Sequence, residues 1–71
     1  MSNTRRFQFI YARIDPSDNM CIEVVDTTND YSMNPDYIPL TEYNEEYLFK
    51  YYNWDNGKFY YDPEYTQEFI P

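Results

Sequence analysis

The sequence contains no histidine and only one cysteine, Cys21, in 71 residues. A single cysteine cannot form an internal disulfide, and without histidine the Cys/His zinc sites that stabilise many small domains are excluded. The most common general base and the usual partner of a catalytic nucleophile are missing as well. We therefore expect no metal, no cofactor and no enzymatic activity. Cys21 lies in an apolar strand pattern and is expected to be a small buried hydrophobe.

Basic residues are also scarce, with five Lys and Arg against thirteen Asp and Glu, which gives a net charge of −8. Nine of the acidic residues lie between Arg13 and Lys50, a stretch with no basic side chain. This charge argues against nucleic acid or an anionic membrane as partner and favours a basic one. No apolar run is long enough for a membrane-spanning helix, and the start "MSNTRR" lacks a signal-peptide core. We expect a soluble protein made in the cytoplasm.

Aromatic side chains, by contrast, are abundant: 10 Tyr, 5 Phe and 1 Trp make up 23% of the chain. The length predicts a single small domain over residues 1–71, and such a domain buries only about 60% of the surface of its unfolded chain. Because each ring can bury roughly 150–250 Å², the rings are the main candidates for the core. A chain this short can hardly enclose all of them, so the surplus favours contact with another protein.

The first third of the chain predicts an antiparallel hairpin over residues 5–26. The run "RFQFIYARI" alternates aromatic residues on one face with apolar residues on the other, which is typical of a central strand. The next residues, "DPSDN", form a turn, and "MCIEVVD" resumes the strand pattern. We expect four residues of this hairpin to contribute to the core: Phe7, Phe9, Ile22 and Val24.

The middle of the chain predicts a loop, an edge strand and a short helix. Residues 27–36 are polar and form the loop, and in residues 37–40 Pro39 restricts any strand to a sheet edge. Either Thr41 or Asn44 can cap a helix of two turns at best through "EEYLFK". The predicted fold class is therefore mainly β, a small α+β fold of two antiparallel hairpins with a short helix between them.

The second hairpin is predicted by "YYNWDNGKFYYD", residues 51–62, in which Asn56 and Gly57 suit a two-residue type I′ turn. Such a turn sets the register of the flanking strands. It predicts four cross-strand pairs: Asp55 with Lys58, Trp54 with Phe59, Asn53 with Tyr60, and Tyr52 with Tyr61. The rings of Trp54, Phe59, Tyr52 and Tyr61 are expected to form one uncharged aromatic cluster on one face.

Residues 63–71 are expected to form an extended tail. The apolar Phe69 and Ile70 at its end either fold back on the domain or add a strand to a partner. Together with Tyr65 they are the predicted partner contacts. The full set of predicted interaction residues is Tyr52, Trp54, Phe59, Tyr61, Tyr65, Phe69 and Ile70.

Four short motifs occur in a fixed order: "YARID", "IEVVDT", "IPL" followed by "EYNEEYLFKYY", and "WDNGKFYYD". In this order the chain resembles, over residues 9–62, small proteins of tailed bacteriophages encoded among tail, baseplate and fibre genes. The resemblance implies a non-enzymatic virion component, such as a tail, baseplate, fibre or capsid-decorating subunit, located in the virion or the host cytoplasm. Its partner would be a larger virion protein, and a homo-oligomer is left open. The chain departs from the pattern in its extra tyrosines and in the loop at 27–36.

Two other functions are compatible with the composition. An acidic inhibitor of the anti-restriction or anti-CRISPR type places carboxylates where the phosphates of nucleic acid would lie, although duplex DNA carries a charge every ~1.7 Å along its axis. A glycan-binding module stacks sugars on Trp and Tyr rings and binds their hydroxyl groups with Asp and Asn. Protein contact is the favoured alternative, because Tyr and Trp are enriched at interfaces.

Overall fold

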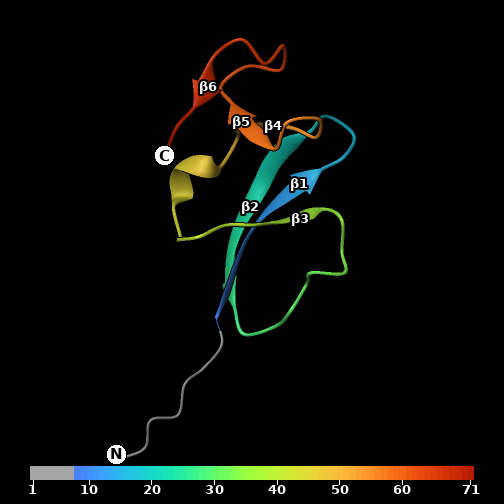
Figure 1. Ribbon diagram of the computed structural model, residues 1–71, viewed down its shortest axis with the longest axis vertical. Coiled ribbons are helices and arrows are strands. Elements are labelled where there is room, and N and C mark those ends of the chain that lie inside the picture. Colours follow the sequence, from blue (N-terminus) through green and yellow to red (C-terminus); the bar gives the residue numbers. More distant parts are fainter. Residues whose placement is uncertain (1–7) are drawn as a thin grey trace, which may run out of the picture.

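A computed structural model describes residues 8–71, which form one six-stranded antiparallel sheet in the order β3-β1-β2-β4-β5-β6 (Figure 1). The mainly β fold is thus confirmed, whereas the predicted helix is a single 3₁₀ turn, η1. Phe7, predicted for the core, lies outside the described residues. The elements are β1 (Phe9–Asp15), β2 (Met20–Thr27), β3 (Tyr37–Pro39), η1 (Glu45–Tyr47), β4 (Tyr51–Asn53), β5 (Lys58–Tyr60) and β6 (Glu68–Phe69).

The long hairpin of β1 and β2 is confirmed, and β1 is an inner strand between β3 and β2, as its two apolar faces predict. The connecting turn closes because the N–H groups of Asp18 and Asn19 both donate to the carbonyl of Asp15, at 3.3 and 2.7 Å. Asn19 ends this turn in the left-handed region, with φ 65°. Asparagine tolerates that conformation better than most residues, so the sequence of the turn matches its geometry.

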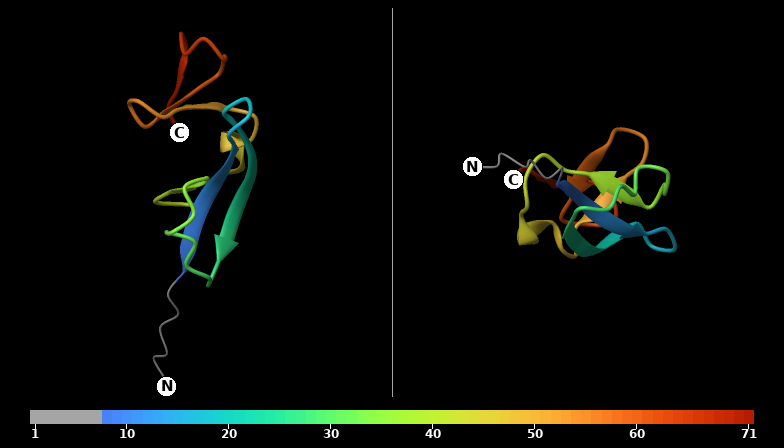
Figure 2. Two further views of the ribbon diagram at one scale, coloured as in Figure 1. Left: turned by 90° about the vertical axis from the view of Figure 1, so that its right-hand side faces the viewer. Right: turned by 90° about the horizontal axis from the view of Figure 1, so that it is seen from below.

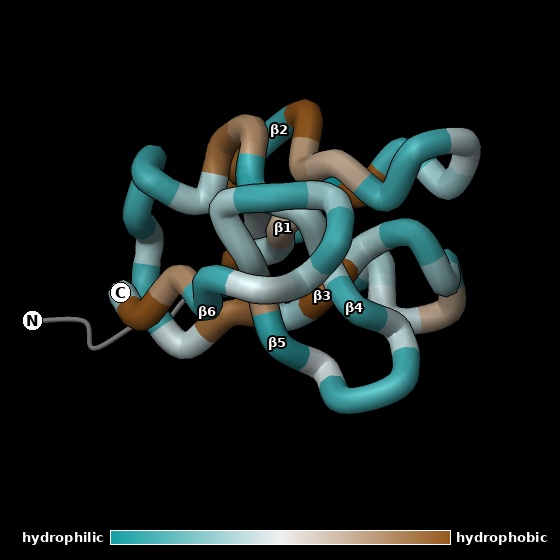
Figure 3. Tube along the Cα trace, turned by 90° about the horizontal axis from the view of Figure 1, so that it is seen from above, coloured by the Kyte–Doolittle hydropathy of each residue, from teal (hydrophilic) through white to brown (hydrophobic). Residues whose placement is uncertain are grey.

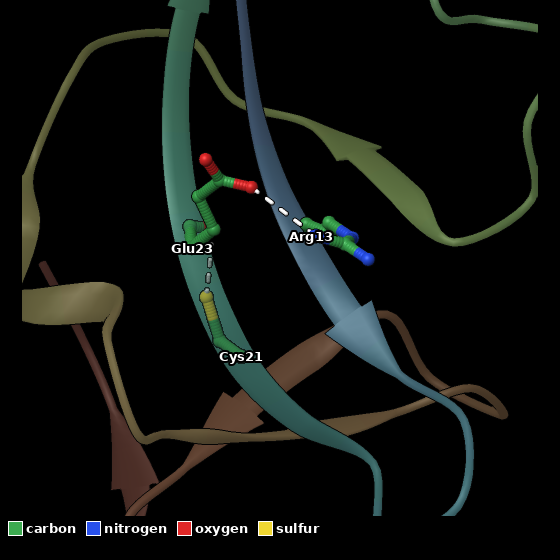
Figure 4. A network of polar contacts seen from close by, with 3 residues as sticks. All are labelled: Arg13, Cys21 and Glu23. Carbon is green, nitrogen blue, oxygen red and sulfur yellow. Dashed lines mark hydrogen bonds and ion pairs between the residues drawn. The ribbon is translucent and has the colours of Figure 1, made fainter.

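A bulge in β2 changes which side chains face the core. The β1–β2 register shifts so that Ile22 has no partner on β1. Cys21 and Val24 therefore face the same side although they are three residues apart, and Ile22 is 41% exposed. The prediction that Ile22 belongs to the core was wrong, because strict alternation assumes an unbroken strand. Figure 4 shows the bulge region, where the Cys21 thiol lies 3.4 Å from the carbonyl of Glu23 and the side chain of Glu23 pairs with Arg13.

The core lies between the long hairpin and the C-terminal strands. Figure 2 shows the β4–β5 hairpin lying across one end of the β1–β2 hairpin, which lets side chains of both meet. Burial raises the pKa of the Cys21 thiol, which therefore stays protonated at neutral pH. The buried cluster consists of Ala12, Ile14, Cys21, Phe59 and Phe69, with Val24, Ile38, Leu40, Tyr47 and Tyr52 packed against it.

A second cluster of rings covers the opposite face of β1. Tyr11 alternates with the core residue Ala12 and is itself buried. Three other rings surround Tyr11, at centroid distances of 5.7 to 6.2 Å: Phe9, Tyr31 and Tyr37. The N–H of Tyr31 donates to the Tyr11 hydroxyl, which in turn donates to Asp30, so the loop after β2 is fixed on this face. Phe9, predicted for the main core, is half-buried here instead.

The β4–β5 hairpin exists, but its predicted two-residue turn is wrong. The loop has four residues, 54–57, and Tyr52 lies opposite Phe59. Gly57 has φ 75°, whereas Asn56 does not have the positive φ that a type I′ turn needs. Side-chain oxygens of the two asparagines favour the wider loop, because Asn53 accepts from the N–H of Asp55 and Asn56 from that of Lys58.

The change of register has two consequences for the predicted pairs. It amounts to two residues, so every side chain keeps its face, and Tyr52 and Phe59 still meet. The predicted pairing of Lys58 with Asp55 is replaced by an ion pair with Glu68 on β6, at 3.8 Å.

The two edges of the sheet differ. The ladder turns the backbone groups of Ile38 toward β1, so those of Tyr37 and Pro39 point outward. The N–H of Tyr37 already donates to the carbonyl of Asn34, and Pro39 has no N–H, so β3 offers an arriving strand no donor. The predicted edge position of Pro39 is confirmed. At the other edge, Glu68–Phe69 pairs with β5 as β6, so of the two alternatives given for the C-terminal tail the structure shows the one in which it folds back on the domain.

Candidate functional site

The seven predicted interaction residues all belong to the C-terminal half of the sheet, β4 to β6 and the segments that join and follow them. Two of them, Phe59 and Phe69, are buried in the core, and Tyr52 and Tyr65 are half-buried. The remaining three are exposed: Trp54 at 43%, Tyr61 at 55% and Ile70 at 76%. Of the seven predicted residues, only these three have large apolar surfaces available to a partner.

The rings of this region contact one another in a chain. Tyr52 lies 4.9 Å from Trp54, edge to face, and 4.9 Å from Phe59. Tyr61 contacts Phe69 instead, at 5.7 Å. Three of the four rings predicted to cluster are thus in direct contact, and the fourth joins through the C-terminal strand. Edge-to-face and tilted ring pairs contribute more to stability than their buried area alone would give. These contacts therefore stabilise the β4–β5 hairpin.

Lys50 lies over the outer end of this chain of rings. Its ammonium is 5.1 Å from the ring centre of Tyr61 and 4.9 Å from that of Phe69, distances typical of cation–π contacts. It also donates to the carbonyl of Glu46 in η1, at 2.7 Å. The sequence places Lys50 after the acidic start of the predicted helix. In the structure its ammonium interacts with a carbonyl of η1 and with two aromatic rings.

Asn19 joins three segments that are distant in the sequence. Its side-chain oxygen accepts from the indole N–H of Trp54 at 2.8 Å, and its amide donates to the Tyr65 hydroxyl at 3.2 Å. Its own carbonyl accepts from the N–H of Tyr52 at 2.8 Å. Trp54 and Tyr65 therefore anchor the second hairpin to the first turn. Sequence reasoning missed this residue, and the one available signal was an asparagine at the end of a predicted turn.

A groove of about 280 Å³ lies between the β3 segment and the far ends of β5 and β6. Phe59 and Phe69 are among its lining side chains, and the Lys58–Glu68 ion pair also borders it. The other lining residues are Ile38, Pro39, Leu40, Thr41, Tyr47, Gly57 and Pro71. This lining can hold an apolar side chain or a small ligand, and its polar side chains are Thr41 and the ion-paired Lys58 and Glu68.

Much of the acidic density serves local structure. Four aspartates accept hydrogen bonds from residues two to five positions further on, which holds a turn closed in each case. Asp15 accepts from the N–H and hydroxyl of Ser17, Asp18 from the N–H of Met20, Asp30 from the N–H of Ser32, and Asp62 from Thr66 and Gln67. Within residues 8–71 no group of Cys, Asp and Glu is arranged to hold a metal ion. No helix in the same range is long and apolar enough to cross a membrane.

These turns predict an acid-sensitive fold. Hydrogen bonds from the Thr66 hydroxyl and the backbone of Gln67 and Thr66 lower the pKa of Asp62 below its ordinary value. The stabilisation from this carboxylate is complete above pH ~4, the ordinary pKa of an aspartate, and is lost as the pH falls through the lower folded value. In Asp62→Asn, we expect the urea midpoint to depend less on pH between roughly pH 5 and 2.5.

The matched control for this measurement is Asp55→Asn, since the Asp55 carboxylate accepts no hydrogen bond from residues 8–71. Its pH profile is expected to match that of the unmodified protein. An equal change in both variants would show that overall charge, and not the Asp62 turn, sets the pH dependence.

Four exposed apolar side chains were not predicted as interaction residues: Ile22, Met33, Tyr43 and Phe49. Hydropathy alone does not reveal the exposed rings. Figure 3 shows the β4–β5 hairpin mostly in pale and teal colours, because tyrosine and tryptophan do not rank as hydrophobic on that scale. Of the four residues, Phe49 is distinguished by its backbone, which has φ 67°.

Comparisons of the chain with protein-family models, with curated proteins and with solved structures find no match.

Proposed function

We propose that the protein is a non-enzymatic accessory subunit that binds a larger protein. The observation that carries this proposal is the exposure of Trp54, Tyr61 and Ile70 in one part of the sheet of a strongly acidic chain. Aromatic side chains are enriched where proteins meet, and each supplies contact area at a low entropic cost. The excess of acidic residues favours a partner with a basic surface.

The larger assembly in this proposal is the particle of a tailed bacteriophage. The order of the four sequence motifs supports this choice through the resemblance described above. The accessory subunit would occupy the tail, baseplate, fibre or capsid surface, and would pass through the host cytoplasm before assembly.

The two rival functions have less support in the geometry. Mimicry of nucleic acid needs carboxylates that face a partner, whereas Asp15, Asp30 and Asp62 bind their own turns. A glycan site needs ring faces with free polar groups beside them, whereas the Trp54 indole N–H is bonded to Asn19. Neither rival is proposed here.

The test is whether the protein sediments with purified virions. Particles from infected cells are separated on a density gradient, and the protein is quantified in each fraction by mass spectrometry. We expect a constant ratio of this protein to the major virion proteins across the particle peak. Recovery only at the top of the gradient would contradict the virion proposal. Salt-sensitive binding to a nucleic-acid enzyme, or a change in Trp54 fluorescence on adding cell-wall polysaccharide, would favour a rival function.

A further inference from the structure

Phe49 occupies a backbone position that usually belongs to glycine. The 3₁₀ turn η1 ends as the N–H of Leu48 donates to the carbonyl of Glu45, at 3.0 Å, and the next residue, Phe49, has φ 67°. Helices commonly end on a left-handed residue, and glycine is preferred there because a Cβ makes this conformation costly. A phenylalanine at this position needs a reason of its own.

Within residues 8–71, the other three left-handed residues each have such a reason. Gly57 has no Cβ, and Asn19 is a tolerated type whose side chain makes two hydrogen bonds. Tyr65, with φ 61°, packs its ring 5.3 Å from that of Tyr60. Its hydroxyl also accepts from Asn19 and donates to the carbonyl of Tyr52. The strain at Tyr65 is therefore offset by contacts of its own side chain.

No comparable contact explains Phe49. The residue is 66% exposed, and its ring makes no aromatic or cation–π contact with any residue from 8 to 71. Its backbone, in contrast, is fixed, because the N–H of Phe49 donates to the carbonyl of Cys21 at 2.8 Å. This bond holds it next to Ile22, which the β2 bulge leaves exposed. The chain thus holds an unfavourable backbone conformation and leaves the ring in solvent.

We propose that Phe49 is an anchor that inserts into an apolar pocket on the partner protein, with Ile22 beside it and Lys or Arg side chains at the rim of that pocket. The bond to Cys21 accounts for the left-handed backbone at position 49 but not for a phenylalanine there. Strained positions are concentrated at binding sites, and single buried aromatics dominate many interfaces.

The expected basic rim follows from Glu45 and Glu46 in the adjoining turn η1 and from the net charge of −8. The adjacent Lys50 is engaged by the Glu46 carbonyl and by the rings of Tyr61 and Phe69, and Glu23 is paired with Arg13. This inference rests on the proposed function, whose partner contact it specifies.

Stability provides the first test, because it needs no partner. Phe49→Gly removes the strain and no packing, so we expect the thermal midpoint to rise by roughly 4 °C. Tyr65→Gly is the matched control, since it relieves the same strain but loses ring packing and hydrogen bonds, and its midpoint is expected to fall. A fall in Phe49→Gly as well would show that the ring stabilises the fold, and would overturn the inference.

Photo-crosslinking provides the second test. Benzoylphenylalanine is placed at position 49, and at position 33 as an exposed control, in protein made in infected cells. We expect position 49 alone to crosslink, to a single protein and at an apolar site bordered by Lys or Arg. The absence of a product at position 49, or a product with a second copy of this chain, would overturn the inference.

The two proposals can fail separately. If the unmodified protein sediments with virions but position 49 gives no crosslink, the anchor is wrong and the virion function stands. If the protein stays free of virions but position 49 crosslinks a different protein with a basic rim, the anchor stands and the virion assignment is wrong. If neither result is obtained, both are wrong.

Discussion

Phe69→Ala is expected to destabilise the protein by about 3–5 kcal/mol, which is comparable to its whole stability. The ring is 4% exposed and packs against Tyr47 and Tyr61, with the Lys50 ammonium above it. A domain of 71 residues is stable by only about 4–10 kcal/mol. No disulfide is available to compensate, so we expect a large unfolded fraction in Phe69→Ala at 37 °C.

The neighbouring residue provides the control. Ile70 is mostly exposed, so Ile70→Ala is expected to change the free energy of unfolding by less than about 0.5 kcal/mol. Both variants are compared with the unmodified protein by urea denaturation, followed by circular dichroism and by Trp54 fluorescence. Similar small effects from both substitutions would mean that the C-terminal strand does not complete the core.

Asn19→Ala is expected to cost about 2–4 kcal/mol. The substitution removes two side-chain hydrogen bonds, each worth about 0.5–1 kcal/mol. It also places alanine in a left-handed conformation, which alanine tolerates less well than asparagine does. This strain adds about 1–2 kcal/mol. The loss is large because this residue connects the first turn to both Trp54 and Tyr65.

Asn19→Gly separates the two contributions, because glycine keeps the backbone conformation and loses only the hydrogen bonds. We expect it to cost about 1–2 kcal/mol in urea denaturation. In both variants Trp54 fluorescence should shift to the red, since the indole N–H loses its partner. Equal costs for Ala and Gly would attribute the whole effect to the hydrogen bonds and none to the backbone.

The outline of the sheet could be predicted from the sequence, whereas its irregularities could not. Alternation identified β1 and β2 and the inner position of β1, and Pro39 identified the edge strand. The bulge at Ile22 cannot be read from an alternating pattern. It depends on tertiary packing, which places both Cys21 and Val24 on the core side of β2. The predicted helix was reduced to one turn, since Phe49 leaves the helical region to bond Cys21.

The second hairpin shows how local and tertiary preferences combine. Asn56 and Gly57 correctly marked a turn, but the hydrogen bonds of Asn53 and Asn56 favour a loop two residues longer. Because the register differs from the predicted one by an even number of residues, the strand side chains lie on the predicted faces of the hairpin. Tyr52 and Phe59 are therefore still in contact. A difference of one residue would have moved every ring to the opposite face.

The candidate site was predicted only in part. Aromatic density pointed to the C-terminal half, but it could not separate the buried Phe59 and Phe69 from the exposed Tyr61. Many rings are half-buried because they pack against one another, as in the cluster around Tyr11. The number of exposed rings is therefore smaller than the aromatic content predicts. Phe49 could not have been found from sequence, because its backbone conformation depends on a contact with β2.

The donor-free outer edge of β3 bears on the fate of the protein at high concentration. A chain rich in β-forming aromatics is at risk of stacking into fibrils through any open strand. At this edge, a strand from another molecule would meet carbonyl oxygens and a proline ring but no amide hydrogen, so a continuous ladder could not grow from it. Pro39 therefore lets β3 keep a rim of unpaired backbone that cannot act as a template for a further strand.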